Sequence, residues 1–248
     1  MKPLKRASEM RLSELAAYID QSVLKPEFTQ EDIERYIREG VDFGCKTVCI
    51  NPASLPIARE ICEGTNTGVC VVCDFPFGLS STASKVQQAR EILRQGGVED
   101  LDIVSNYGWI RSGLWDRVRE DILPVSEACH ERGALLKVIL ETDALTLPEV
   151  AKATDIACEA GADFVKTSTG FYTGGEAKGA TTEVIRVMLD AAKGRCRVKG
   201  SGGIRDRAHF FELIDLGIDR MGIGYRSTPV VLGVTPQQAL KMRSEGRY

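Results

Sequence analysis

The sequence predicts a single domain folded as an eight-stranded (β/α)8 barrel, an α/β fold in which each strand is followed by a helix. Eight short apolar runs alternate with amphipathic segments, a pattern typical of parallel strands joined by crossover helices. The chain has 248 residues, close to the roughly 250 that eight such units need. An open, doubly wound sheet is the alternative, but no Gly-x-Gly-x-x-Gly fingerprint follows an early strand. We therefore expect residues 1–248 to form one domain.

Each predicted strand is short and rich in valine, isoleucine or leucine, and most are followed by glycine or small polar residues. Helical periodicity is clearest over residues 30–40, 84–97 and 206–217, and all three segments end on glycine, as helix C-termini often do. The predicted strands are residues 17–21, 45–51, 68–75, 101–106, 135–141, 163–169, 196–202 and 219–224.

The composition argues against several classes of protein. The chain is 43% hydrophobic and 27% charged with a formal net charge of −3, so no basic excess indicates nucleic-acid binding or a membrane surface. The charged N-terminus is not followed by an apolar stretch, which disfavours a signal peptide. No run of about 18 apolar residues is present to span a bilayer. These features argue against nucleic-acid and membrane partners.

Eight cysteines in a chain of this length do not indicate a disulfide framework, and we expect free thiols in a reducing, cytoplasmic compartment. Cys70 and Cys73 form a Cys-x-x-Cys motif, but period-two geometry sends them to opposite faces of a strand, and no second pair stands at zinc spacing. A redox or metal role for this pair is the alternative. His130 and His209 are the only histidines, too few for a histidine-rich zinc site. The sequence predicts no resident metal.

Among the charged residues within predicted strands, four are each opposed by apolar neighbours on the other face and point to chemistry: Asp102, Lys137, Lys166 and Lys199. The outer face of a barrel strand packs under helices and must be apolar, so the charged face points inward. Lys166 and Lys199 are each followed within four residues by glycine, which suits the C-terminal end of a strand, where active sites of this fold lie. The alternative is that these positions are misassigned in register or lie at strand edges.

Two inward lysines on neighbouring strands suggest an amine held neutral for attack on a carbonyl. A second ammonium about 4 Å away costs roughly 4 kcal/mol at an effective dielectric of 20, or about three pKa units. The neutral amine then forms an imine with an aldehyde or ketone, and Asp102 moves protons directly or through a water. A protonated imine accepts electrons, so a neighbouring C–C bond can be broken or made. This is class I aldolase chemistry, which needs no metal.

Several blocks of the chain resemble those of the deoxyribose-phosphate aldolase family, in the same order and over nearly the whole length. The most specific are FVKTSTG (164–170) and VKGSGGIR (198–205). The resemblance implies a TIM barrel that makes 2-deoxy-D-ribose 5-phosphate reversibly from acetaldehyde and D-glyceraldehyde 3-phosphate, without a cofactor, in a homodimer or larger homo-oligomer. The other matching blocks are residues 18–29, 47–52, 74–78, 137–142, 179–181 and 219–222.

The resemblance assigns roles residue by residue. Lys166 matches the lysine that forms the Schiff base, Lys199 the lysine that lowers the pKa of that amine and relays protons, and Asp102 the proton-transfer aspartate. The residues predicted to bind the substrate or its phosphate are Lys137, Thr167, Ser201, Gly202, Gly203, Arg205, Gly222, Gly224 and Arg226.

The chain departs from the family pattern at three places. Gln21 stands where the family usually has histidine, and Gln88 where glutamate is common. After the last strand, two serines of the family's phosphate loop are replaced by Gly224 and Tyr225. Backbone amides and Arg226 can still bind phosphate, whereas Tyr225 can narrow the pocket. The terminal Tyr248 is either a frayed end or a mobile proton relay.

These departures keep other functions open. A related Schiff-base aldolase can act on a different or unphosphorylated aldehyde. A phosphosugar isomerase or synthase shares the glycine-rich phosphate loops but does not need two inward lysines. A sugar-phosphate-binding protein without turnover does not need Asp102 together with both lysines.

Overall fold

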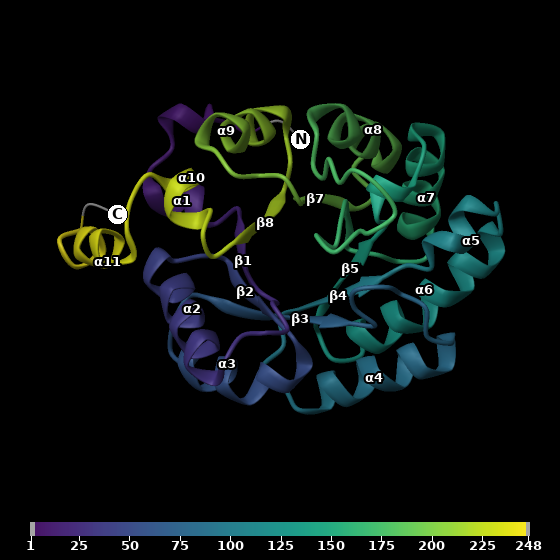
Figure 1. The fold of residues 1–248 in the computed structure, drawn as a ribbon, viewed down its shortest axis with the longest axis horizontal. Coiled ribbons are helices and arrows are strands. Elements are labelled where there is room, and N and C mark those ends of the chain that lie inside the picture. The colour runs from purple at the N-terminus through teal and green to yellow at the C-terminus, as the bar shows by residue number, and fades with distance from the viewer. Residues whose placement is uncertain (1–2, 247–248) are drawn as a thin grey trace.

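The computed structural model describes residues 3–246 and has eight parallel strands closed into a barrel in the order β1 to β8. The predicted fold class is confirmed. Figure 1 looks into the barrel, with the strands around its centre and the helices outside them. The strands are β1 (Ile19–Val23), β2 (Thr47–Ile50), β3 (Gly68–Cys73), β4 (Asp100–Val104), β5 (Leu135–Ile139), β6 (Phe164–Lys166), β7 (Arg197–Ser201) and β8 (Arg220–Gly224).

Helices follow the strands and cover the outside of the barrel, while α11 packs against α2 beyond the ring (Figure 1). Short 3₁₀ turns lie at Ala7–Glu9, Pro52–Ser54 and Thr142–Ala144. The helices are α1 (Leu12–Ala16), α2 (Gln30–Phe43), α3 (Leu55–Cys62), α4 (Thr82–Arg94), α5 (Tyr107–Arg111), α6 (Trp115–His130), α7 (Leu147–Glu159), α8 (Thr182–Ala192), α9 (Arg207–Leu216), α10 (Thr228–Leu232) and α11 (Pro236–Ser244).

Local signals fix where the helices begin and end. Thr29 caps α2 by accepting a hydrogen bond from the amide of Asp32, and Gly44 ends that helix in the left-handed conformation. The predicted helix over 84–97 is α4, which ends earlier, at Arg94, because Gly96 and Gly97 both take a positive φ of 74° that a helix cannot continue through.

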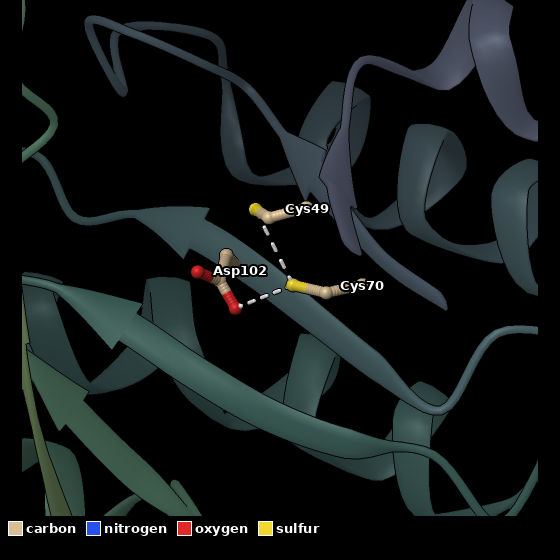
Figure 2. Close-up of side chains that lie close together, drawn as sticks. All are labelled: Cys49, Cys70 and Asp102. Carbon is tan, nitrogen blue, oxygen red and sulfur yellow. Dashed lines mark hydrogen bonds between the residues drawn. The ribbon is translucent and has the colours of Figure 1, made fainter. Parts of the chain in front are cut away.

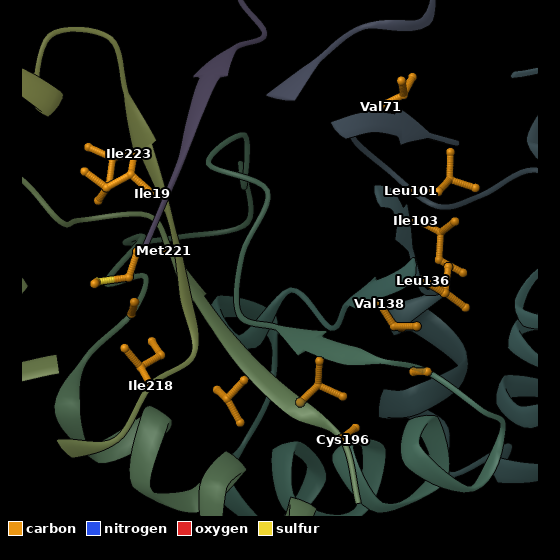
Figure 3. Close-up of a cluster of buried hydrophobic side chains, with 14 of the residues drawn as sticks. Ile19, Val71, Leu101, Ile103, Leu136, Val138, Cys196, Ile218, Met221 and Ile223 are labelled. Carbon is orange, nitrogen blue, oxygen red and sulfur yellow. The ribbon is translucent and has the colours of Figure 1, made fainter. Parts of the chain in front are cut away.

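The main hydrophobic core lies between the barrel and its helices, on the outward faces of the strands. Leu101, Leu136 and Ile223 are fully buried there, and Figure 3 shows part of this layer. Inward positions alternate with these residues, as the period-two argument predicted. In the strand register Asp102 is paired with Lys137, and Lys166 with Lys199. The apolar outer layer therefore fixes which side chains enter the barrel.

One disulfide corrects the prediction that all cysteines are free. Cys158, near the end of α7, is bonded to Cys196, just before β7, with their Cα atoms 5.6 Å apart. The two residues are 38 positions apart in sequence, and the tertiary fold brings them together. Among the described residues the other six cysteines are free and buried, including Cys70 and Cys73 of the Cys-x-x-Cys motif.

Within residues 3–246, no helix has the length and apolar character required to cross a membrane.

The outer core should control the stability of the barrel. Leu136→Ala removes a fully buried side chain, and we expect it to lower the free energy of unfolding by about 2–5 kcal/mol through lost burial and a residual cavity. Leu123→Ala is the matched control, because Leu123 is 41% exposed, and it should change stability by less than about 1 kcal/mol. Urea unfolding followed by circular dichroism measures both. Equal effects of the two substitutions would contradict this assignment of the core.

Candidate active site

The carboxylate of Asp102 lies at the centre of the barrel and is shared by three lysines. Its Oδ2 accepts hydrogen bonds from Lys166 Nζ and Lys199 Nζ, each at 2.8 Å, and its Oδ1 accepts one from Lys137 Nζ at 3.1 Å. Lys166 is 3% exposed, and the other three residues are fully buried. The structure thus brings together all four charged residues that the strand pattern pointed inward.

Three further charged residues, which the sequence analysis missed, extend this network of ion pairs: Asp20, Asp100 and Arg220. Asp20 accepts from Lys199 at 2.6 Å and from Arg220 at 2.7 Å, and Asp100 is ion-paired with Lys137. The same period-two rule could have found two of them. Asp100 lies two residues before Asp102 on the same face, and Asp20 alternates with the outward Ile19 and Gln21.

The buried network contains one more basic group than carboxylates. Three aspartates, at positions 20, 100 and 102, face Lys137, Lys166, Lys199 and Arg220. An unpaired buried charge is costly, so the network favours loss of one proton. Lys166 pairs with Asp102 alone, whereas Lys199 pairs with two of the aspartates and Lys137 with all three. Lys166 therefore has the fewest carboxylate partners of the three lysines.

The pKa shifts in the network follow from the same contacts. Burial opposes the charge of Asp102, but Lys137, Lys166 and Lys199 outweigh it and hold the pKa of Asp102 well below its usual value. Burial likewise opposes the charge of Lys199, but Asp102 and Asp20 raise its pKa above that of a free lysine. Lys199 is therefore a fixed ammonium that shares the Oδ2 atom of Asp102 with Lys166.

The loop after β6 is held from both sides by buried hydrogen bonds. Thr167 Oγ1 donates to the carbonyl of Ser201 at 2.7 Å and accepts from its amide at 2.8 Å. This hydroxyl therefore joins the ends of β6 and β7, and its single O–H is not available to donate to a ligand. Glu141, also missed, accepts from the amide and the hydroxyl of Thr169, and burial raises the pKa of Glu141. These bonds position the chain that follows Lys166.

Glycines after β7 and in β8 shape a cup at the mouth of the barrel. Gly202 and Gly203 have φ of 82° and 76°, and within residues 3–246 neither their amides nor that of Arg205 donate to a protein group. Gly179 lies against Gly202 so closely that a Cβ on it would stand 2.3 Å from the Gly202 carbonyl oxygen. Backbone N–H groups in such turns can bind an anion such as phosphate.

In β8, a Cβ on Gly222 would lie 3.5 Å from Lys199 Cε, so glycine leaves space beside the network. Gly224 opens onto free space. Its neighbour Tyr225 lies with its ring 3.9 Å from that of Tyr36 on α2 and 5.3 Å from that of Phe28, and the guanidinium of Arg226 lies over the Tyr225 ring at 5.3 Å. The tyrosine ring is thus packed on the helix side of the loop. Arg205 and Arg226 are the exposed or half-exposed cations nearest in sequence to the cup.

The other departures lie away from the charged network. Gln21 faces outward and donates to the carbonyl of Tyr36 at 2.6 Å. Gln88 accepts from the amide of Asp74 at 2.7 Å and so holds the loop after β3. Tyr248 lies outside the described residues.

An apolar cluster inside the barrel borders the lysines on the side of β2 and β3. It contains Leu24, Cys49, Cys70 and Val72, with Phe75 and Phe171 packed on it. Cys49 Sγ lies 3.5 Å from Cys70 Sγ, which lies 3.1 Å from Asp102 Oδ1 (Figure 2). The hydrogen bond from Cys70 lowers the pKa of Cys49, whereas burial raises the pKa of Cys70.

The chain is similar to known aldolases in sequence and in fold. A family model described as DeoC/LacD family aldolase matches residues 15–225. A deoxyribose-phosphate aldolase of Mannheimia succiniciproducens is 42% identical over 213 residues, which cover 86% of this chain and 92% of the relative. The solved structure named QR15, an aldolase, has a TM-score of 0.79 and 36% identity and covers 94% of this chain and 98% of its own. A deoxyribose phosphate aldolase from Aeropyrum pernix, described as a unique tetramer, has a TM-score of 0.79 and 29% identity, covering 90% and 91%.

The buried network should stabilise the fold in a pH-dependent way. Asp20→Asn leaves Lys199 and Arg220 short of a carboxylate, and we expect a loss of about 3–5 kcal/mol at pH 7. Because folding holds the pKa of Asp20 below its unfolded value of about 3.9, this contribution is complete above that pH and shrinks by about 1.4 kcal/mol per unit below it. Urea unfolding at pH 7 and pH 3 tests this. Asp32→Asn, which removes an exposed pair with Arg35, should cost under about 1 kcal/mol.

Proposed function

The chain belongs to the DeoC/LacD family of aldolases, and on that premise we propose that it cleaves 2-deoxy-D-ribose 5-phosphate reversibly into acetaldehyde and D-glyceraldehyde 3-phosphate through an imine on Lys166. The enzyme is a carbon–carbon lyase. The observation that carries the proposed chemistry is the single carboxylate oxygen of Asp102 that accepts from both Lys166 and Lys199.

Imine formation begins with the loss of the Lys166 proton. Lys199 keeps its own proton because Asp20 and Asp102 both pair with it, so its positive charge remains beside the reacting amine. The neutral Nζ of Lys166 attacks C1 of the open-chain sugar, and water leaves after the carbinol oxygen has been protonated. Asp102 contacts both lysines and can carry protons between them and the reacting atoms, directly or through a water.

Cleavage follows from the electron demand of the protonated imine. A base removes the proton of the C3 hydroxyl, the C2–C3 bonding pair moves toward the iminium nitrogen, and D-glyceraldehyde 3-phosphate leaves. The remaining enamine takes a proton at C2, and hydrolysis of the resulting imine releases acetaldehyde and returns the amine of Lys166. We assign these proton transfers to Asp102, whose Oδ2 lies 2.8 Å from the ammonium of Lys199.

The phosphate of the sugar is assigned to the glycine cup. Free amides of Gly202, Gly203 and Arg205 supply donors, and Arg205 or Arg226 supplies charge. The other residues predicted to bind substrate have supporting roles. Gly222 and Gly224 leave space for the substrate, and the hydrogen bond between Ser201 and Thr167 holds the loop after β6. Lys137 donates to Asp102 and fixes its carboxylate. We further propose that the protein is cytoplasmic, consists of a single domain and forms a homo-oligomer. The Aeropyrum pernix relative, described as a tetramer, supports the last point.

A second candidate is a Schiff-base aldolase for an unphosphorylated aldehyde. The replacement of both phosphate-loop serines by Gly224 and Tyr225 favours it, because their hydroxyl donors are gone. An isomerase or synthase on the same barrel is disfavoured, since the cost of burying Lys166 and Lys199 would then serve no reaction.

Lys166 should carry the imine. We expect acetaldehyde followed by borohydride to add a two-carbon mass to the peptide containing residues 164–170, as read by mass spectrometry. Lys166→Arg should lose nearly all cleavage activity, because a guanidinium stays protonated at any usable pH. The exposed Lys152→Arg is the control and should retain activity. An adduct on Lys199 instead, or none, would reject the assignment.

Lys199 should act through its positive charge. In Lys199→Leu, the amine at Lys166 loses a neighbouring cation and gives up its proton less readily, so the rising limb of the rate–pH profile should move to higher pH by roughly one to three units. The profile of kcat, together with the rate of borohydride trapping at each pH, measures this shift. A variant that keeps the wild-type profile would show that the two ammonium groups are not coupled.

The glycine cup should still prefer the phosphorylated sugar. We expect Gly224→Ser to lower KM for 2-deoxyribose 5-phosphate by about 2- to 10-fold, since one neutral hydrogen bond contributes about 0.5–1.5 kcal/mol, and a Cβ there meets no neighbour. Gly224→Ala is the matched control without the hydroxyl. KM for free 2-deoxyribose should stay unchanged. If the wild type cleaves the free sugar as well as the phosphate, the second candidate is favoured instead.

A further inference from the structure

Two thiols and one carboxylate form a cluster in the barrel that the proposed reaction does not use as a unit. Cys49 of β2, Cys70 of β3 and Asp102 of β4 are fully buried, and their potential ligand atoms all lie within 4.8 Å of one another (Figure 2). Two thiolates and a carboxylate are a donor set that zinc accepts in proteins. The cluster therefore has the composition of a site for a thiophilic cation.

The spacing of the three side chains fits a single ion. The sulfurs of Cys49 and Cys70 are 3.5 Å apart, and Cys70 Sγ is 3.1 Å from Asp102 Oδ1. Zinc lies about 2.3 Å from sulfur and about 2.0–2.2 Å from carboxylate oxygen. An ion at those lengths spans donor pairs separated by 3 to 4 Å, so small side-chain shifts suffice. A water can occupy a fourth position, as in open zinc sites.

Strand register, and not a sequence motif, builds the cluster. Cys49 and Cys70 are direct partners in the pairing of β2 with β3, and both point into the barrel. Cys73 completes the Cys-x-x-Cys motif but faces outward, where its sulfur lies 3.2 Å from Gln88. The sequence motif therefore suggests the wrong pair of cysteines.

We propose that Cys49, Cys70 and Asp102 bind one thiophilic divalent cation such as Zn²⁺, and that its binding reversibly inhibits the enzyme. One Zn²⁺ displaces the protons of the two thiols, which leave to solvent, and no electrons are transferred. The net charge of the buried network is then unchanged. The ion therefore adds no net positive charge beside the three lysines that contact Asp102.

Inhibition follows from the withdrawal of Asp102 and rests on the proposed function. The ion takes Oδ1 of Asp102, the oxygen that otherwise accepts from Lys137, while Lys137 keeps Asp20 and Asp100 as partners. A carboxylate bound to zinc is a poor proton carrier, so the steps assigned to Asp102 should slow. Binding itself does not depend on that assignment.

Binding can be measured on the pre-reduced wild-type protein, with its free thiols counted beforehand. Calorimetric titration with Zn²⁺ should give one tight site, with release of about two protons per ion. Cd²⁺ should produce the ultraviolet thiolate-to-metal band. Aldolase activity should fall in proportion to occupancy and return on adding EDTA. Absence of a stoichiometric site in the wild type overturns the proposal.

Matched variants locate the ion. Cys49→Ser and Cys70→Ser keep the size and hydrogen bonding of the side chain but remove a soft ligand. Each should weaken Zn²⁺ binding by more than about a hundredfold. Loss of a residue that only supports a ligand typically weakens metal binding by about 10- to 100-fold. Cys73→Ser, on the same strand but facing outward, should bind like the wild type. Cys49→Ala gives a second test if Cys49→Ser fails to fold.

Retention of tight binding in both inward serine variants overturns the assigned ligands. If binding is lost in those variants but full occupancy leaves wild-type activity intact, the inhibition is overturned while the cation site stands. A protein that binds Zn²⁺ as expected but never cleaves the sugar phosphate contradicts the proposed function alone.

Discussion

The Asp102 carboxylate is the constraint on which the rest of the barrel interior depends. One oxygen accepts from Lys166 and Lys199 at 2.8 Å, and the other accepts from Lys137 at 3.1 Å. Without this carboxylate, three buried ammonium groups would face one another in a medium where each unit of charge is costly. The same contact lowers the pKa of Asp102 and raises that of Lys199. The ion-pair network and the proposed proton pathway are therefore one set of atoms.

The order of partners within the network separates supporting residues from reactive ones. Lys137 is held by three aspartates at the bottom, Lys199 by two, and Lys166 by one near the mouth. Lys166, the lysine with the fewest carboxylate partners, is the one to which we assign the imine. The number of carboxylate partners of each lysine thus connects the geometry of the strands to the proposed imine chemistry.

The thiols of Cys49 and Cys70 are connected to the same ion-pair network through Asp102. Cys70 contacts the Asp102 oxygen that Lys137 also uses, and Cys49 contacts Cys70. A cation that replaces the two thiol protons leaves the charge of the interior unchanged, so the network that supports catalysis would also tolerate the inhibitor. The apolar cluster of Leu24, Val72, Phe75 and Phe171 surrounds the thiols and limits their contact with solvent.

The sequence by itself determined the alternation of strands and helices and the inward direction of the charged residues. Period-two patterning requires an apolar outer face, and that requirement alone directs Asp102, Lys137, Lys166 and Lys199 inward. Tertiary structure decided which of these residues meet, because side-chain contacts across a closed barrel depend on strand register. Asp20 and Arg220 joined the network in this way, and Cys158 met Cys196 across 38 residues. The pairing of Cys49 with Cys70, and not Cys70 with Cys73, has the same physical cause: neighbours in the sheet share a face, whereas positions 70 and 73 on one strand do not.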